Sequence, residues 1–183
     1  MKRFLLAGVL ALGSTMAAAA SFTLSSPDIA PRQTIGPKFV FNGFGCSGEN
    51  VSPALNWKNA PAGTKSFAIM VHDPDAPTGG AGFWHWVVVN LPATMTGLAQ
   101  GDGGLDSKNL PQGAQQIRND YGQAAWGGPC PPVGDKPHHY NFTVYALKTD
   151  RLDIPAGTST SVVGFMINSQ ALAKATLTGR YGR

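Results

Sequence analysis

Three short segments of the sequence carry the side chains best suited to ligand chemistry. The segment DPDAP contains the carboxyl groups of Asp73 and Asp75. The segment WHWVVVN places His85 between two tryptophans, and GGPCPPVGDKPHHY ends in two histidines and Tyr140. Carboxylates, imidazoles and a phenol supply hydrogen-bond acceptors and donors, and an imidazole changes charge near neutral pH. Such a set fits an oxyanion pocket, a metal site or a hydrolytic His/Asp base.

The two acids of DPDAP differ in the local hydrogen bonds open to them. Asp73 can close an Asx-turn onto the N–H of residue 75. Asp75 cannot do the same, because Pro77 has no N–H, so it must bond elsewhere or be solvated. Strand alternation places Asp73 on the same face as Val71, with His72 on the opposite face.

The third segment begins with a rigid loop. Its GPCPP run, which starts at Gly128, contains three prolines that fix φ and remove three N–H donors. His138 and Tyr140 follow at the start of an apolar run, where strand alternation places them on one face and His139 on the other. An imidazole and a phenol on one face can both donate hydrogen bonds to an anion. The oxyanion pocket is therefore the favoured interpretation.

Other kinds of site have weaker support. A metal site lacks H-x-x-x-H or H-x-H spacing. A hydrolase lacks a G-x-S-x-G nucleophile, and Cys130 lies between prolines. The run GFGCSG matches a dinucleotide fingerprint, but Pro53 follows closely and no acid stands about 20 positions on, so a turn is favoured. We expect no metal and no cofactor.

Short β-branched and aromatic runs between glycines and prolines predict a mainly β chain. The expected strands are Ser21–Ser26, Lys38–Asn42, Ser66–Asp73, Phe83–Asn90 and Tyr140–Leu147. In the third and fourth, the residues that would point to either face are mostly apolar, which is typical of strands covered on both faces. A helical repeat covers only Ser161–Leu177. We expect a β-sandwich with long loops and one helix near the C-terminus.

Residues 1–20 have the parts of a secretory signal peptide. A positive start precedes the apolar run Phe4–Met16, and small residues for cleavage follow at Ala17–Ser21. A membrane anchor would need a longer apolar run. Residues 21–183 then form one expected domain without stable membrane insertion.

Charge and cysteine content narrow the partners. Without the two basic residues of the signal peptide, the chain has a net charge of +2 and no Lys/Arg cluster that would bind nucleic acid. In an exported chain the even pair Cys46 and Cys130 favours a disulfide, and two buried free thiols are the alternative. The sequence does not separate a monomer from a homodimer.

Taken in order, DPDAP, WHWVVVN and GPCPPVGDKPHHY resemble the phosphatidylethanolamine-binding protein family, in particular its bacterial Raf kinase inhibitor-like branch. The runs GCSGENVSPALNW, APAGTKSFA and LAKATLTGRYGR extend the likeness over nearly all of residues 21–183. The resemblance implies antiparallel sheets and a small preformed pocket for phosphate or phosphorylated head groups such as phosphoethanolamine. The ligand-binding residues that it implies are Asp73, Asp75, His85, Gly128, Pro129, Pro131, His138 and Tyr140.

The resemblance also implies a cis peptide bond at Pro74 or Pro77. The sequence departs from the family at Gln170, where many bacterial members have histidine, and at the PC pair of the proline loop, which leaves open which Gly-Pro faces the ligand. We expect the acids to raise the pKa of His85 or His138, so that an imidazole carries the proton.

These observations predict a periplasmic or secreted bacterial binding protein, not an enzyme, that takes a small anionic or phosphorylated ligand. A role as modulator or inhibitor of another protein is compatible with this function. The alternatives are a periplasmic hydrolase with a pocket His/Asp base and an interaction protein that acts through surface loops such as 97–113.

Overall fold

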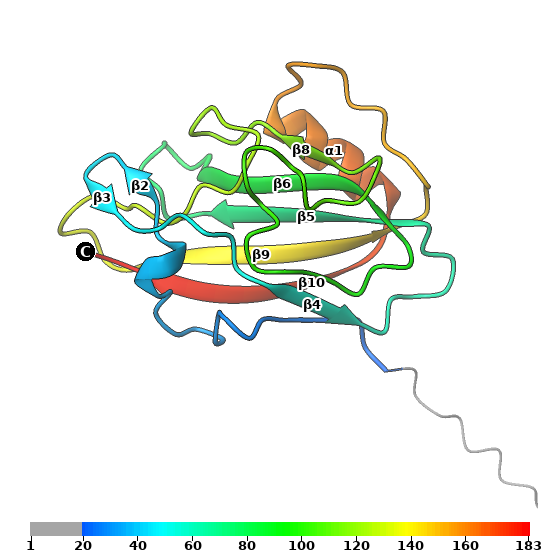
Figure 1. The fold of residues 1–183 in the computed structure, drawn as a ribbon, viewed down its shortest axis with the longest axis horizontal. Coiled ribbons are helices and arrows are strands. Elements are labelled where there is room, and N and C mark those ends of the chain that lie inside the picture. Colours follow the sequence, from blue (N-terminus) through cyan, green and yellow to red (C-terminus); the bar gives the residue numbers. More distant parts are fainter. Residues whose placement is uncertain (1–19) are drawn as a thin grey trace, which may run out of the picture.

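The computed structural model describes residues 20–183, which form three antiparallel sheets and one α-helix (Figure 1). The large sheet has the order β10-β9-β5-β6-β8, with β5 Ser66–Asp73, β6 Phe83–Pro92, β8 Gln115–Ile117, β9 His138–Leu147 and β10 Ala171–Tyr181. A three-stranded sheet contains β1 Thr23–Ser25, β4 Leu55–Lys58 and β7 Gly97–Leu98. The strands β2 Asn42–Gly43 and β3 Cys46–Ser47 form a hairpin, and α1 spans Thr160–Gln170. The predicted mainly β, antiparallel fold is confirmed.

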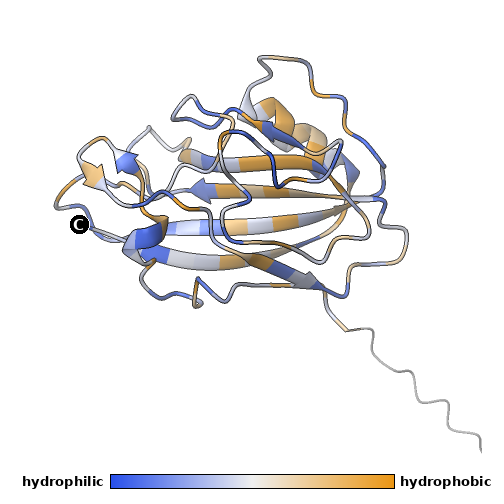
Figure 2. Cartoon of the chain, viewed as in Figure 1, coloured by the Kyte–Doolittle hydropathy of each residue, from blue (hydrophilic) through white to orange (hydrophobic). Residues whose placement is uncertain are grey.

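Two apolar layers cover the faces of the large sheet. On one face, Ile69 and Val71 of β5 pack in a core that includes Trp57 of β4. On the other face, Met70 belongs to a second core with Val163 of α1. Figure 2 shows the hydrophobic residues concentrated along the central strands and on α1. The prediction that β5 is covered on both faces is therefore confirmed.

The C-terminal helix is shorter than predicted. The helix ends at Gln170, and Ala171 begins β10, which pairs with β9 as far as Tyr181 opposite His138. Ala175 and Leu177 are buried while the residue between them is exposed, which is the two-residue period of a strand. Pairing with β9 therefore overrides the helix propensity of this alanine- and leucine-rich run.

The prediction of a strand over Lys38–Asn42 is wrong. Residues Pro37–Phe39 form a 3₁₀ turn, and the N–H of Phe41 donates to the carbonyl of Pro129 at 3.1 Å. The backbone of this segment thus bonds to the proline loop and to residues 48–51, which takes the place of pairing in a sheet. The short strands β4, β7 and β8 and the edge strand β10 had no predicted counterpart.

A disulfide joins Cys46 and Cys130, with an Sγ–Sγ distance of 2.10 Å and Cα atoms 5.9 Å apart. The expected bridge is confirmed, and it ties the β2–β3 hairpin to the proline loop. The glycine-rich run GFGCSG forms the turn of this hairpin, as predicted. In residues 20–183 no helix is long and apolar enough to cross a membrane. The predicted signal peptide lies outside the described residues, except for Ala20.

The disulfide closes a loop of 84 residues, which restricts the unfolded chain. We predict that replacing both cysteines by alanine lowers the free energy of unfolding by about 4–5 kcal/mol. Denaturant unfolding of the variant and of the wild type, with and without reductant, measures this difference. Reductant should lower the wild-type value to that of the variant, and equal midpoints for the oxidised wild type and the variant would contradict the prediction.

Candidate functional site: a cavity at the strand ends

Three strands of the large sheet bring the predicted functional side chains to one place. Since β5 runs antiparallel to both β9 and β6, it ends where its two neighbours begin. Figure 1 shows this end of the sheet beside the β2–β3 hairpin and the C-terminus. A cavity of about 380 Å³ lies here. Of the predicted ligand-binding residues, those that line it are Asp73, His85, Pro131, His138 and Tyr140.

The carboxylate of Asp73 connects the end of β5 to β9. Its Oδ1 accepts the N–H of Asp75 at 2.8 Å and that of Ala76 at 3.1 Å, which confirms the predicted Asx-turn. Its Oδ2 lies 2.7 Å from Nδ1 of His138, and the two side chains are 4% and 5% exposed. Residues 20–183 contain no cis peptide bond, so the expectation of one at Pro74 or Pro77 is wrong; the chain turns through the Asp73 hydrogen bonds.

His138 makes a second contact with a carboxylate. Its Nε2 lies 3.4 Å from Oδ2 of Asp135, which belongs to the loop before β9. Because Asp73 can only accept a hydrogen bond when ionised, Nδ1 of His138 donates to it. His138 and Tyr140 share the cavity face of β9, as the alternation predicted.

A β-bulge sets the position of His85. The pairing of β5 with β6 passes from Val71 opposite Trp86 to His72 opposite Trp84, so His85 has no partner across the ladder. A bulge re-aims the side chain that it carries and is frequent beside functional sites. His85 is 2% exposed, and its Nδ1 lies 2.6 Å from the carbonyl oxygen of Gly127.

The protonation state of His85 differs from the one expected. Burial lowers the pKa of His85 to about 4, and this effect outweighs the opposing contributions of the Gly127 carbonyl and of the Asp73 charge. The imidazole is therefore neutral at physiological pH. The expectation that nearby acids raise its pKa is wrong for His85. Burial removes water from the charged imidazolium and lowers the pKa by more than the charges of Asp73 and Asp120 raise it.

Two buried polar atoms of the site have no hydrogen-bond partner within residues 20–183. They are Nε2 of His85 and the hydroxyl oxygen of Tyr140. The two rings meet edge to face, with centroids 5.1 Å apart. Burial, followed by the charge of Asp73, raises the pKa of Tyr140 above its usual range, so the hydroxyl keeps its proton. Unpaired buried polar atoms are costly and rare in folded proteins, so each of these two atoms calls for an explanation.

Asp75 does not line the cavity. Its Oδ2 accepts the backbone N–H of His139 at 2.7 Å and lies 2.7 Å from Nδ1 of the same residue. Both side chains are about 40% exposed. The acid thus has a partner on β9, on the face opposite the cavity, and it fixes the path of the chain after β5.

Gly128 and Pro129 lie behind the cavity wall, where the chain packs closely. A side chain at Gly128 would place its Cβ 2.0 Å from the carbonyl oxygen of Phe39, so only glycine fits there. The cavity is lined by the next residues of the loop, from Cys130 to Pro132. The residues of the loop at the cavity are thus Cys130–Pro132, and Gly128 and Pro129 are not among them. Gln170 ends α1 and does not line the cavity.

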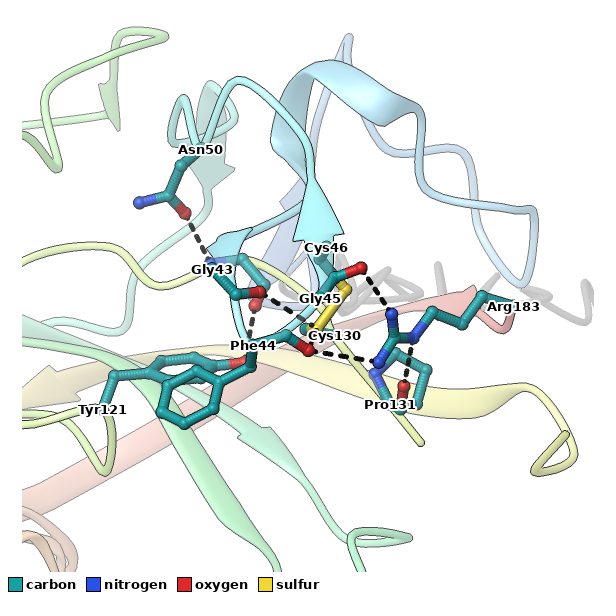
Figure 3. Close-up of a disulfide and its surroundings, with 10 residues drawn as sticks. Gly43, Phe44, Gly45, Cys46, Asn50, Tyr121, Cys130, Pro131 and Arg183 are labelled. Carbon is teal, nitrogen blue, oxygen red and sulfur yellow. Dashed lines mark hydrogen bonds between the residues drawn. A yellow bond between two sulfur atoms is a disulfide. The ribbon is translucent and has the colours of Figure 1, made fainter. Parts of the chain in front are cut away.

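Aromatic and charged residues from distant loops complete the wall. Tyr121 packs edge to face on Phe83 at a centroid distance of 4.7 Å, and its hydroxyl donates to the carbonyl of Gly128 at 3.1 Å. Phe44, at the tip of the β2–β3 hairpin, lies 5.7 Å from Tyr121 between ring centroids, and Figure 3 shows the two rings together. Asp120 lines the same wall. Sequence reasoning missed these residues because no periodic pattern marks them.

Arg183 holds the hairpin against the proline loop. Its guanidinium donates from Nε to the carbonyl of Pro131 at 2.7 Å, from Nη1 to Gly45 at 2.7 Å and from Nη2 to Phe44 at 3.3 Å (Figure 3). The side chain also lines the cavity, where it adds a positive charge at the wall. Among the described residues no group of three His, Cys, Asp or Glu side chains could hold a metal ion.

The fold and the site define the class of protein: a mainly β protein of antiparallel sheets, with a cavity at the ends of three strands. Residues 25–182 match the sequence model of the phosphatidylethanolamine-binding protein family. The chain belongs to this family, and the resemblance seen in the sequence is confirmed.

Within the family, the chain is similar to two proteins of Escherichia coli. It is 49% identical to UPF0098 protein YbcL over 181 residues, 99% of this chain and 98% of that protein. It is 46% identical to UPF0098 protein YbhB over 159 residues, 86% and 98% of the two chains. The crystal structure of YbcL, described as a new member of the mammalian PEBP family, matches with a TM-score of 0.87 at 50% identity over 90% of this chain and 99% of that one.

The geometry predicts how the ring of His85 behaves with pH. Its ¹⁵N signals should show a neutral imidazole with the proton on Nδ1 from pH 8 down to pH 5.5, because its pKa lies near 4. Two-dimensional ¹H–¹⁵N spectra of the rings measure this, and the half-exposed His139 serves as the comparison. A titration of His85 near its ordinary value of 6.5 would contradict the assignment.

The same shift predicts a contribution of His85 to acid lability. The folded state binds fewer protons here than the unfolded state, so this contribution to stability is present above pH 6.5 and is lost as pH falls toward 4. The fall in unfolding free energy from pH 7.5 to 4.5 should be smaller in H85Q than in the wild type. Urea unfolding at both pH values measures it, with H139Q as the matched control. An equal fall in H85Q and the wild type would contradict the prediction.

Proposed function

We propose that the protein is an exported binding protein whose cavity takes a small oxyanion or a phosphorylated head group. The observation that carries the proposal is the pair of buried polar atoms without partners, Nε2 of His85 and the hydroxyl of Tyr140, in a cavity of about 380 Å³. A bound ligand with oxygen atoms would satisfy both. Cavities of this size, apolar with a few convergent polar groups, are typical of small-molecule sites.

The surroundings supply the other requirements of an oxyanion site. Arg183 provides a positive charge, and the hydroxyl of Tyr140 provides a donor that stays protonated. The disulfide at Cys130 and the neighbouring prolines hold the wall in place before a ligand enters. A preformed site loses less entropy on binding than one that must be ordered by its ligand.

The proposed location is outside the cytoplasm. The disulfide between Cys46 and Cys130 supports an oxidising compartment. A Mycobacterium tuberculosis protein that is named as a lipoprotein, LppC, is 36% identical over 164 residues, 90% of this chain and 74% of that protein. A periplasmic or secreted location, reached by cleavage of residues 1–20, accounts for both observations.

Binding explains the site better than hydrolysis does. The buried Asp73–His138 pair has the form of a general base, but Cys130 Sγ is held in the disulfide and is not available as a nucleophile. The hydroxyl of Thr78 at the cavity is directed to the backbone carbonyl of Gly82 at 3.0 Å. Action on another protein through loops such as 97–113 is compatible with ligand binding and needs a separate test.

A tyrosine variant tests the proposal. We predict that Y140F weakens the binding of inorganic phosphate and of phosphoethanolamine by about tenfold or more, since a hydrogen bond to a charged group is worth about 1.5–3 kcal/mol. NMR titrations that follow the rings of His85 and His138 measure the affinity. Y145F is the matched control, because Tyr145 belongs to the core on the opposite face of β9. Equal affinities in Y140F and the wild type would rule out the cavity as the binding site.

A further inference from the structure

We infer that the cavity selects oxyanions that carry a proton, such as inorganic phosphate and phosphate monoesters, over fully ionised sulfate and phosphate diesters. The inference rests on the proposed function, and it specifies the ligand class of that site. It follows from three observations: the tautomer of His85, the hydrogen bonds that the nearby carboxylates already accept from the protein, and the charges around the cavity.

The contact of His85 with Gly127 fixes its tautomer. A carbonyl oxygen can only accept a hydrogen bond, so the 2.6 Å contact requires the proton on Nδ1. A neutral imidazole has one N–H, and its Nε2 then presents a lone pair. The deep burial of the ring favours this neutral form, with a pKa of about 4. The free nitrogen of His85 is therefore an acceptor that needs a donor from the ligand.

The carboxylates beside this nitrogen already have donors. Asp73 accepts two N–H groups of its own turn and a hydrogen bond from His138. Asp120 accepts the backbone N–H of Trp84 at 2.7 Å. Nε2 of His85 has no such partner within residues 20–183. A P–OH group of a ligand would supply it.

A protonated phosphate group matches both unpaired atoms of the site. Its hydroxyl donates to Nε2 of His85, while an ionised oxygen accepts the proton of the Tyr140 hydroxyl. Sulfate at neutral pH, like a phosphate diester, has no proton to donate. Either would turn an oxygen lone pair toward the lone pair of Nε2 and leave that buried acceptor unpaired. Sites built to hydrogen-bond a hydroxyl reject analogues that lack it by large factors.

The charges around the cavity favour a monoanionic phosphate over sulfate. The ionisable side chains that line it are Asp73, Asp120, Tyr121, His138, Tyr140 and Arg183. Asp135 contacts His138 from the loop before β9. Arg183 thus shares the cavity lining with two acids, and its guanidinium is already engaged with three carbonyls. A monoanion is accommodated at lower electrostatic cost than a dianion.

Calorimetric titrations of the purified protein at pH 5.5 and pH 8 test the inference. The probes are inorganic phosphate, sulfate, methyl phosphate and dimethyl phosphate. At pH 5.5 we expect phosphate and methyl phosphate to bind at least about a hundredfold more tightly than sulfate and dimethyl phosphate. A phosphate monoester loses its last proton with a pKa of about 6, so methyl phosphate should weaken by about tenfold or more at pH 8. Inorganic phosphate, which keeps a P–OH group at pH 8, should weaken less.

The variant H85Q tests whether His85 provides the selectivity. A glutamine amide can present an N–H where Nε2 presents a lone pair, so the preference for phosphate over sulfate should fall below about tenfold. Y145F should keep the wild-type preference, because its hydroxyl lies on the other face of β9.

These outcomes distinguish a failure of the selectivity from a failure of the proposed function. Phosphate and sulfate that bind the wild type equally well would overturn the selectivity and leave an oxyanion site in place. An unchanged preference for phosphate over sulfate in H85Q would show that His85 is not the group that accepts the hydrogen bond from the ligand's P–OH group. No detectable binding of any of the four probes would overturn the selectivity together with the proposed function.

Discussion

The site depends on one buried carboxylate, that of Asp73. A charge taken out of water costs several kcal/mol unless hydrogen bonds and an opposite charge or donor replace the water. Asp73 meets this requirement with two N–H groups of the turn after β5 and with the imidazole of His138 on β9. The turn and the neighbouring strand are thereby fixed relative to each other. The hydrogen bonds of this one group thus hold the end of β5 and the start of β9 together at the cavity.

The outer wall is held by a different kind of constraint. It consists of the β2–β3 hairpin, the proline loop and the last residue of the chain, none of which belongs to the large sheet. The disulfide joins the first two, and Arg183, the third, donates to carbonyls of both (Figure 3). Segments that are far apart in the chain are thus held together as one wall of the cavity.

Strand alternation predicted correctly how the site residues on regular strands are oriented. The strand over Ser66–Asp73 was predicted with its observed bounds, because both of its faces are buried and apolar. The alternation along β9 placed His138 and Tyr140 on one face, and the structure agrees. Alternation alone separates the Asp73 face from the His72 face, and the structure places Asp73 at the cavity.

The remainder depends on contacts between distant segments. A bulge positions His85, and its burial, not its neighbours in sequence, decides its charge. Tyr121 lies in a loop and Arg183 follows β10, and both line the cavity. Neither belongs to a strand or helix whose sequence repeat would mark it as a site residue. The run after Gln170 has residues suited to a helix, and only the unpaired edge of β9 makes it a strand. Local pattern carries no information on these long-range choices.

The most direct test of the account is a crystal structure of the protein grown with methyl phosphate at pH 5.5. The account predicts one ligand in the cavity, with one phosphate oxygen at hydrogen-bond distance from Nε2 of His85 and another at that distance from the hydroxyl of Tyr140, about 2.6–3.2 Å in each case. A ligand bound elsewhere, or a cavity ligand that leaves both atoms without a partner, would contradict the claim that these two atoms define the binding site.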